Sequence, residues 1–240
     1  MSALNAESPA GRVALISGAS RGIGLAIAKE LLAAGWRVSA GTRSPVVDLV
    51  HLPESCYQWA RFDAFEPETE QQWVEAAFRH FGRIDAIVHN AGILSDRTVI
   101  NATTREFDEL FEVNVKSPMR LTQHVWPYLK RAPEGKVLVI ASLAGKRVRA
   151  AEGGLYSMSK AAALMLAHGI RHAGDADLIR CTAICPGFVA TDMASDVSDD
   201  IKAQLTRPEE VARIARMALE LPATASVAEI PVSWQVESMF

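Results

Sequence analysis

Three residues whose side chains can move or stabilise a proton stand close together in the sequence. Tyr156 and Lys160 are four residues apart, and Ser142 lies fourteen residues before Tyr156. On a helix, side chains at positions i and i+4 share one face, with Cβ atoms roughly 5–6 Å apart. An ammonium group at that distance favours the phenolate and lowers the pKa of tyrosine, which is about 10 in the free amino acid. The pair suits a general acid–base, although a surface pair on a helix has the same spacing.

A glycine-rich turn early in the chain indicates a nucleotide partner for this chemistry. It spans residues 17–24, Ser-Gly-Ala-Ser-Arg-Gly-Ile-Gly, and follows the apolar residues 13–16. Glycines let the backbone turn tightly and approach a ligand, and the N-terminus of the following helix attracts an anion. The spacing Gly-x-x-x-Gly-x-Gly differs from the commoner Gly-x-Gly-x-x-Gly, and no Gly-Lys-Ser/Thr follows, so the turn is not a P-loop. Its position favours a dinucleotide pyrophosphate site over a purely structural turn.

Residues near the end of the second apolar run indicate which nucleotide is bound. In NAD sites an Asp or Glu about 20 residues beyond the glycine turn accepts the ribose hydroxyl, whereas an Arg serves the 2′-phosphate of NADP. Thr42 and Arg43 stand at that point, and Arg21 lies in the glycine turn. Two guanidinium groups suit a dianionic phosphate. NADP(H) is therefore predicted in preference to NAD(H), and the alternative is that both arginines are solvated surface residues.

The elements that position these residues alternate along the chain. Apolar runs predict strands at 13–16, 38–42, 57–62, 84–89, 136–141 and 178–184, and amphipathic segments predict helices at 22–34, 66–81, 103–130, around Tyr156 and at 208–219. Pro118 and Pro127 are expected to bend or break the long helical stretch. Alternating strands and helices imply βαβ units and a parallel sheet. No linker or repeat divides residues 1–240, so one α/β domain is expected, with a flexible N-terminus at residues 1–10.

Composition argues against several other classes of partner. The 240 residues carry a formal charge of −3, which is too small to suggest nucleic acid or an anionic membrane. No apolar run reaches the roughly 18 residues that cross a bilayer, and residues 1–10 do not resemble a signal peptide. The chain has three cysteines, Cys56, Cys181 and Cys185. Such a small and odd number argues against a disulfide framework, and no metal site is expected. A cytoplasmic location is predicted.

Taken in order, these motifs resemble those of the short-chain dehydrogenase/reductase family over nearly the whole chain. The resemblance implies a Rossmann fold, in which a doubly wound parallel sheet of about seven strands is flanked by helices. It also implies that Tyr156 is the general acid–base, that Lys160 lowers its pKa and binds the nicotinamide ribose, and that Ser142 binds the substrate oxygen. Asn114 matches the helix asparagine that joins a water to the lysine in a proton relay.

The family pattern also implies the remaining cofactor contacts. Asp63 resembles the residue that contacts adenine, Asn90-Ala91-Gly92 lines the cofactor cleft, and the Val189 backbone with the Thr191 hydroxyl holds the carboxamide. The full predicted cofactor set is Gly18, Ser20, Arg21, Gly22, Ile23, Gly24, Thr42, Arg43, Asp63, Ala64, Asn90, Ala91, Gly92, Tyr156, Lys160, Pro186, Gly187, Val189 and Thr191. Two departures stand out: Ser17 replaces the usual threonine, and the chain lacks the frequent final strand that ends in Asp-Gly-Gly.

The predicted function is reversible hydride transfer between NADP(H) and a ketone, an aldehyde or a hydroxy acid. The alternative is a nucleotide-binding regulatory protein on the same fold, which is disfavoured because such a protein is expected to lose Ser142, Tyr156 or Lys160. The basic residues Lys146, Arg147 and Arg149 either form a solvated surface or attract an acidic substrate. The family resemblance further implies a homo-oligomer, a tetramer or a dimer.

Overall fold

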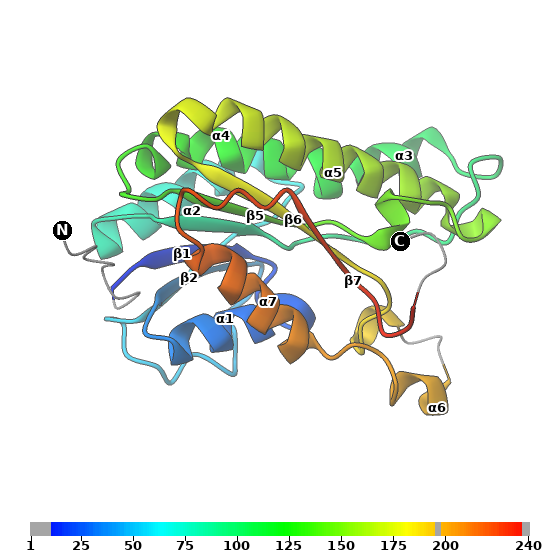
Figure 1. Cartoon of the computed structure of the whole chain (residues 1–240), viewed down its shortest axis with the longest axis horizontal. Helices are drawn as coiled ribbons and strands as arrows, with labels where there is room; N and C mark the ends of the chain where they lie inside the picture. Colours follow the sequence, from blue (N-terminus) through cyan, green and yellow to red (C-terminus); the bar gives the residue numbers. More distant parts are fainter. Residues whose placement is uncertain (1–10, 195–197, 237–240) are drawn as a thin grey trace.

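The computed structural model describes residues 11–194 and 198–236 (Figure 1). The segment 1–10, which is predicted to be a flexible N-terminus, lies outside the described residues. Seven strands form one parallel sheet in the order β3-β2-β1-β4-β5-β6-β7. The strands are β1 Val13–Ser17, β2 Arg37–Thr42, β3 Tyr57–Arg61, β4 Ala86–His89, β5 Lys136–Ile140, β6 Arg180–Pro186 and β7 Glu229–Val232. The predicted doubly wound parallel sheet is confirmed.

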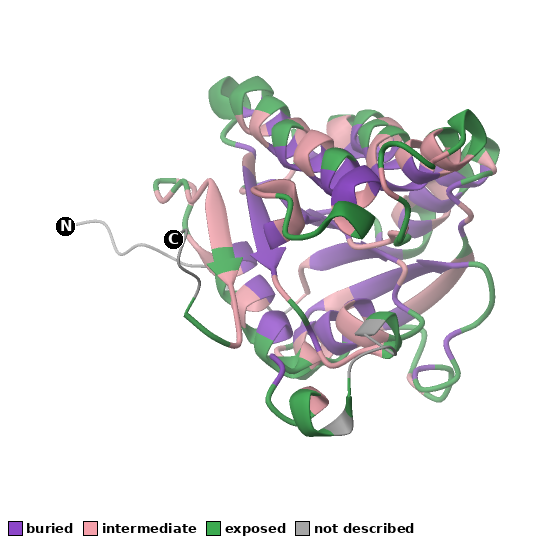
Figure 2. Ribbon diagram, turned by 90° about the vertical axis from the view of Figure 1, so that its right-hand side faces the viewer, coloured by how far each residue is buried: buried purple, intermediate pink, exposed green. Residues whose placement is uncertain are grey.

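Helices cover both faces of this sheet, as Figure 1 shows. The α-helices are α1 Gly22–Ala33, α2 Pro67–Phe81, α3 Thr104–Phe111, α4 Ser117–Leu129, α5 Gly154–Ala173, α6 Asp199–Lys202 and α7 Pro208–Glu220. One hydrophobic core lies between the sheet and α1 with α7, and the other lies between the sheet and α2, α4 and α5. The central strands are therefore enclosed from both sides (Figure 2).

Burial on two faces explains why the central strands are apolar throughout rather than alternating. Every residue of β1 and β5 is buried. Along β1, Ala14 and Ile16 belong to the core beneath α1 and α7, whereas Val13 and Leu15 belong to the opposite core. Side chains alternate between the faces of a strand, and in a parallel sheet covered by helices both faces must be apolar.

Two helices end beside glycines, close to the ends predicted at residues 34 and 81. Helix α2 ends where Gly82 adopts a left-handed conformation with φ of 76°. Gly35 adopts φ of 85° just beyond the end of α1. Glycine accepts this conformation without steric cost and is therefore the common residue at such helix ends.

The predicted effect of the prolines in the stretch 103–130 is only partly right. The α-helical pattern is interrupted at η1, a π-helical turn over Glu112–Lys116 that separates α3 from α4. Pro118 follows this turn in the first turn of α4, where proline is tolerated. Pro127 lies inside α4 and does not break it, and the helix ends two residues later at Leu129.

The chain has a final strand despite lacking the Asp-Gly-Gly ending. Strand β7, Glu229–Val232, pairs with β6 at the edge of the sheet. It contains Pro231 and is not fully buried, so its sequence does not have the apolar run of the other strands. Proline is tolerated on an edge strand because its missing N–H does not face another strand.

Candidate active site

The predicted site residues gather at the carboxyl ends of the strands. The segments 18–24, 42–43, 63–64, 90–92 and 186–191 lie at or just beyond the ends of β1, β2, β3, β4 and β6, in that order. Ser142 follows β5, Tyr156 and Lys160 lie in the first turns of α5, and Asn114 lies in η1. Ligands of doubly wound sheets bind at this edge, where the strand order reverses. The reversal here falls between β1 and β4.

The glycine turn is locked to the loop after β4. Gly18 has φ of 69°, and a Cβ at this position would lie 2.9 Å from the Cα of Ala91. The amide of Asn90 donates from Nδ2 to the carbonyl oxygens of Ser17 and Gly18 at 3.1 and 3.0 Å. The Ser17 hydroxyl accepts from the backbone N–H groups of Asn90 and Ala91. Serine therefore supplies the hydroxyl at the threonine position, and only glycine fits at position 18.

Lys160 lies at the centre of the candidate site. Its ammonium group donates to the carbonyl oxygen of Ile140 at 3.0 Å, and Nζ lies 5.8 Å from the centroid of the Tyr156 ring. A Cβ on Gly92 would lie 3.5 Å from Nζ and 3.2 Å from Oδ1 of Asn114. The loop after β4 thus lies close to both Lys160 and Asn114 at Gly92.

Burial acts in opposite ways on the two titrating groups. It lowers the pKa of Lys160 to about 8, because the ammonium form loses hydration. It raises the pKa of Tyr156 to about 12, and a hydrogen bond with Ser142 offsets only part of that rise. This direction is opposite to the lowering expected from Lys160, because the loss of phenolate hydration outweighs the favourable interactions within the chain.

Ser142 stands at the start of η2, a short 3-10 turn over Leu143–Gly145. Its hydroxyl oxygen accepts from the N–H of Ala144 at 3.1 Å and its hydroxyl donates to the carbonyl of Pro186 at 3.3 Å. The hydrogen bond between Ser142 and Pro186 joins the end of β5 to the end of β6. Together with the hydrogen bond to Tyr156, it fixes the hydroxyl beside the phenol.

Asn114 is 3% exposed and its side chain is fully engaged. Oδ1 accepts from the N–H of Ile93, and Nδ2 donates to the carbonyl of Ile93 and to the hydroxyl of Ser159. Its backbone carbonyl is different, because Pro118, four residues later, has no N–H to donate to it. Ser159 was not among the predicted site residues. The sequence shows it only as a small polar residue next to Lys160.

The residues predicted for the adenine end of the cofactor site differ in exposure. Arg43 is exposed beyond β2, whereas Thr42 is buried and its hydroxyl donates to the carbonyl of Ser44. Arg21 precedes α1 and forms an exposed ion pair of 3.1 Å with Asp192, which belongs to the loop after β6. The two arginines therefore belong to neighbouring segments, and Arg21 also reaches across to the predicted nicotinamide loop.

The basic run after Ser142 does not act as one patch. Lys146 binds the carboxylate of Glu229 on β7. The guanidinium of Arg149 lies 5.7 Å from the ring centroid of Phe188, which is itself 45% exposed. Lys146 is thus bound to Glu229 within the chain, whereas Arg149 lies over the loop after β6.

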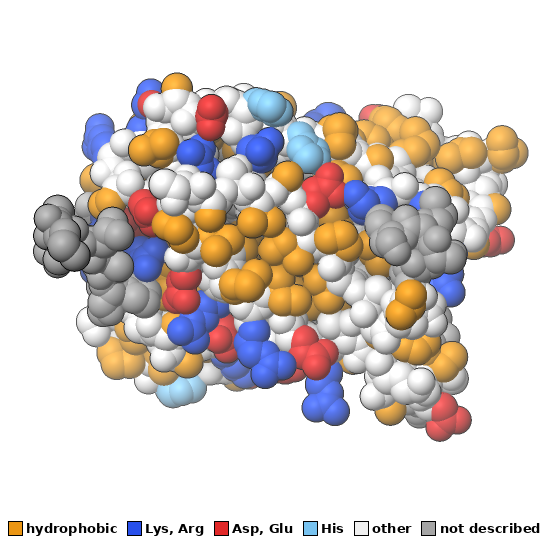
Figure 3. All heavy atoms as spheres, viewed as in Figure 1, with side chains coloured by type: hydrophobic (Ala, Val, Ile, Leu, Met, Phe, Trp, Pro, Cys, Tyr) orange, Lys and Arg blue, Asp and Glu red, His pale blue; other side chains and the backbone are white. Residues whose placement is uncertain are grey.

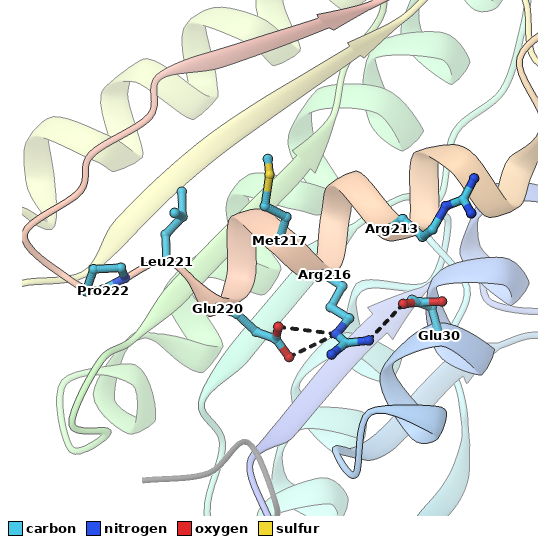
Figure 4. Close-up of a pocket in the computed structure, with 7 residues that line it drawn as sticks. All are labelled: Glu30, Arg213, Arg216, Met217, Glu220, Leu221 and Pro222. Atoms are coloured by element: carbon cyan, nitrogen blue, oxygen red, sulfur yellow. Dashed lines mark hydrogen bonds and ion pairs between the residues drawn. The ribbon is translucent and has the colours of Figure 1, made fainter. Parts of the chain in front are cut away.

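A shallow hollow on the surface lies away from these residues, between α1 and α7 (Figure 4). Its lining residues are Glu30, Arg213, Arg216, Met217, Glu220, Leu221 and Pro222. Arg216 forms ion pairs with Glu30 and Glu220 within the hollow. Leu221 accepts a hydrogen bond from Lys136 at the start of β5, so the hollow lies toward the amino ends of the strands. It contains none of the predicted site residues.

His89, Cys181 and Cys185 are structural residues. His89 is buried and binds the hydroxyl of Thr122 at 2.8 Å, and burial lowers its pKa to about 3. Cys181 and Cys185 are buried, as expected for small apolar residues. Within residues 11–194 and 198–236, no cluster of three or more His, Cys, Asp and Glu side chains has the arrangement of a metal site. No helix among the same residues is long and apolar enough to cross a membrane.

The fold and this edge of the sheet define a dinucleotide-binding Rossmann-type protein. The sequence model of the short chain dehydrogenase family matches residues 12–202, and the chain belongs to this family. Among solved structures, the chain is similar to that of an alcohol dehydrogenase from the archaeon Thermococcus sibiricus, complexed with 5-hydroxy-NADP. That structure has a TM-score of 0.82 and 28% identity, over 95% of this chain and 99% of that one.

Two curated relatives extend the comparison. Agropine synthesis reductase of Rhizobium rhizogenes is 38% identical over 231 residues, which cover 95% of this chain and 53% of that protein. The chain therefore spans about half the length of this relative. The 3-oxoacyl-(acyl-carrier-protein) reductase of Escherichia coli is 30% identical over 202 residues, and the match covers 80% of each chain.

Proposed function

We propose that the protein is an NADP(H)-dependent oxidoreductase that interconverts a carbonyl group and an alcohol, with Tyr156 as general acid–base. The observation that carries the proposal is the meeting of Tyr156, Lys160 and Ser142 beside the glycine turn. The relatives support this class, since those described above are named reductases or a dehydrogenase. A regulatory protein without chemistry has less support, because it would not need these three side chains together.

The chain's own residues fit a dinucleotide. Gly18 and Gly22 adopt φ of 69° and 55°, and the would-be Cβ of Gly22 lies 3.2 Å from the Thr191 side chain, so the turn and the loop after β6 form a close-fitting cradle. We propose that this turn, the loop 90–92 and the loop 186–191 hold the pyrophosphate and nicotinamide parts. NADP(H), when bound, supplies or accepts the hydride and, in its oxidised form, adds a positive ring charge to the site.

Proton transfer is assigned to Tyr156. In reduction its hydroxyl donates a proton to the carbonyl oxygen, and in oxidation its phenolate accepts that proton. Since burial raises the pKa of Tyr156 to about 12 despite the hydrogen bond with Ser142, a positive charge must offset this rise for catalysis near neutral pH. Lys160, whose Nζ lies 5.8 Å from the ring centroid, is placed to supply this charge. Ser142 would stabilise the negative charge that develops on the substrate oxygen.

Asn114 and Lys160 would renew the proton on Tyr156. Both side chains approach Gly92, where a Cβ would lie 3.2 Å from Asn114 Oδ1 and 3.5 Å from Lys160 Nζ. Because Pro118 donates no hydrogen bond to the Asn114 carbonyl, this oxygen has capacity to bind a water. We propose that, after Tyr156 has donated its proton, the Lys160 ammonium returns a proton to the phenolate, and the resulting amine takes a proton from this water, which solvent replenishes.

The nucleotide preference rests on two arginines. Arg43 is exposed beyond β2 and Arg21 stands at the start of α1, and no carboxylate occupies the ends of these segments. Guanidinium groups suit the 2′-phosphate of NADP(H), whereas the ribose hydroxyl of NAD(H) would require a carboxylate. Arg21 must exchange its exposed partner Asp192 for the phosphate, and exposed ion pairs are worth only about 0–1 kcal/mol.

The substrate is proposed to combine an apolar body with an acidic group. Large apolar side chains are exposed on the loops around the site, namely Ile93, Leu94, Val99, Val148, Phe188 and Met193. Arg149 lies over Phe188 and would meet a carboxylate at the same place. A hydroxy acid or keto acid has both features.

Four broader features remain proposals. The single sheet supports one domain over residues 1–240, and the three free cysteines suit the cytoplasm. Met119 on α4, with Met158 and Met165 on α5, is exposed and would suit the contact of a homo-oligomer, a tetramer or a dimer. The partners proposed are thus a small carbonyl or alcohol substrate and further copies of the chain, with neither nucleic acid nor membrane.

A screen of NADPH oxidation against aldehydes, ketones and keto acids tests the central proposal. Activity with at least one carbonyl compound, lost when Tyr156 is replaced by Phe, would support it. Nucleotide binding without turnover on the whole panel would favour the regulatory alternative.

A further inference from the structure

A carboxylate on the last strand joins the two segments that carry the proposed catalytic residues. Glu229 begins β7, and its carboxylate accepts hydrogen bonds from Lys146 Nζ and, at 2.7 Å, from His168 Nε2. Lys146 directly follows η2, the turn that Ser142 begins, and His168 lies on α5 with Tyr156. The three side chains are only 22–28% exposed, so water screens these contacts little.

The sheet register explains why Glu229 points toward α5. Glu229 pairs with Ala183 on β6, and residues in register on adjacent strands share a face of the sheet. Ala183 belongs to the core beneath α2, α4 and α5. On α5, Lys160 and His168 are eight residues apart, which places both on the helix stripe that faces the sheet.

The contacts of Glu229 lie close to the proposed catalytic lysine. Charges on Glu229, Lys146 and Lys160 all act on the thiol of Cys185, whose pKa burial raises to about 11. Turn η2 also rests directly on α5, because a Cβ on Gly145 would lie 2.6 Å from the carbonyl oxygen of Lys160. A displacement of Lys146 would therefore shift Ser142 relative to the helix that carries Tyr156 and Lys160.

We propose that Glu229 is a positioning residue, which holds the Ser142 turn against α5 by binding Lys146 and His168 at the same time. The Lys146 ammonium, by its hydrogen bond, holds the pKa of Glu229 below its usual range, so the carboxylate is ionised at neutral pH. The effect on rate rests on the proposed function, in which Ser142 and Tyr156 must reach one substrate oxygen. The competing explanation is that an inward-pointing charge only protects an edge strand from pairing with another chain.

Steady-state kinetics of Glu229→Gln and Lys146→Met tests the effect on rate. Both variants should lower kcat by about tenfold or more, since a misplacement of roughly 1 Å can cost a hundredfold in rate. The Kd for NADPH should stay within about twofold of wild type, because the glycine turn is not involved. The double variant should be no slower than the slower single variant, because both changes break one contact.

Rates are expressed per NADPH-binding site, so that a loss of folded protein does not count as a loss of kcat. The matched control is Glu209→Gln, which removes an exposed carboxylate from the first turn of α7 and should leave kcat unchanged. Unchanged kcat in Glu229→Gln, even with a lowered Tm, would overturn the proposal and leave the edge-protection explanation.

Hydrogen exchange separates failure of this inference from failure of the proposed function. The N–H groups of Ala144, Gly145 and Lys146 are held by bonds within the turn. In Glu229→Gln these amides should exchange at least about fivefold faster than in wild type, while those of β1 and β5 stay unchanged. Equal exchange in the two proteins refutes the positioning role even if no substrate is found, whereas an inactive wild type with the expected exchange refutes only the proposed function.

Discussion

The ammonium of Lys160 lies 5.8 Å from the centroid of the Tyr156 ring and donates its hydrogen bond to the Ile140 carbonyl rather than to the phenol oxygen. The lysine is thus held by the end of β5, at a fixed distance from the ring. A cation at this distance favours the phenolate, whereas burial raises the pKa of that phenol to about 12.

Tyr156→Phe should lower kcat by about a hundredfold to ten-thousandfold, because it removes the proton donor of the reaction. Nucleotide binding should persist, since the glycine turn is untouched. Turnover and NADPH fluorescence titration measure the two effects separately. Tyr128→Phe on α4 is the matched control and should remain active. Retained turnover in Tyr156→Phe would refute the assignment.

Arg43→Ala should lower kcat/KM for NADPH by about tenfold or more while changing kcat/KM for NADH little, because only NADPH carries the 2′-phosphate. The ratio of the two constants is the measurement. Arg213→Ala, which removes an exposed arginine from α7, should leave the ratio unchanged. A wild-type preference for NADH would contradict the nucleotide assignment.

Arg149→Ala should raise KM for keto acids by about fivefold or more and leave KM for uncharged ketones of similar size unchanged, since a charge-assisted hydrogen bond is worth about 1.5–3 kcal/mol. Lys146 is not part of this test, because Glu229 already binds it. An equal change of KM for charged and uncharged substrates would show that Arg149 acts only through its packing on Phe188.

His89 should make the fold sensitive to acid. Its pKa is about 3 in the folded chain and about 6.5 when unfolded, so between these values only the unfolded chain binds the proton. The free energy of unfolding should therefore decrease as the pH falls from about 6.5 towards 3, by up to about 1.4 kcal/mol per pH unit.

His89→Gln should reduce that dependence, because glutamine does not titrate. Urea unfolding of both proteins between pH 7 and about 4.5 provides the comparison, in which other acidic groups contribute equally. Parallel curves for the two proteins would show that His89 binds a proton as readily in the folded chain as in the unfolded chain over this pH range.

Replacement of two glycines by alanine should have opposite effects on stability. In Gly24→Ala the new methyl group would lie 2.4 Å from the Gly18 carbonyl oxygen and the Asn90 amide, which should cost about 1–3 kcal/mol and weaken nucleotide binding. In Gly169→Ala, in the C-terminal part of α5, nothing lies within 4 Å of the new group. There alanine should increase the free energy of unfolding by about 0.5–1 kcal/mol. Thermal unfolding measures both, and a stable Gly24→Ala would contradict the close packing of the turn.

Much of the fold could be predicted because its signals are local. The apolar runs of β1 and β5 and the glycines after α1 and α2 act through burial and backbone conformation within a few residues. Strand β7 was missed, since an edge strand needs no long apolar run and Pro231 is tolerated there. The interruption before α4 was predicted at the prolines, but it is the π-helical turn Glu112–Lys116.

The sequence by itself determined the alternation of strands and helices along the chain up to β6, the glycine turn and the presence of Tyr156 four residues before Lys160. These depend on residue type and spacing, which chain geometry converts directly into turns and helix faces. Only the tertiary structure decided that Lys146 binds Glu229, that Asn114 binds Ile93 and Ser159, and that burial raises the pKa of Tyr156. Each of these depends on contacts between distant segments and on the exclusion of water. Local spacing in the sequence encodes neither those contacts nor that exclusion of water.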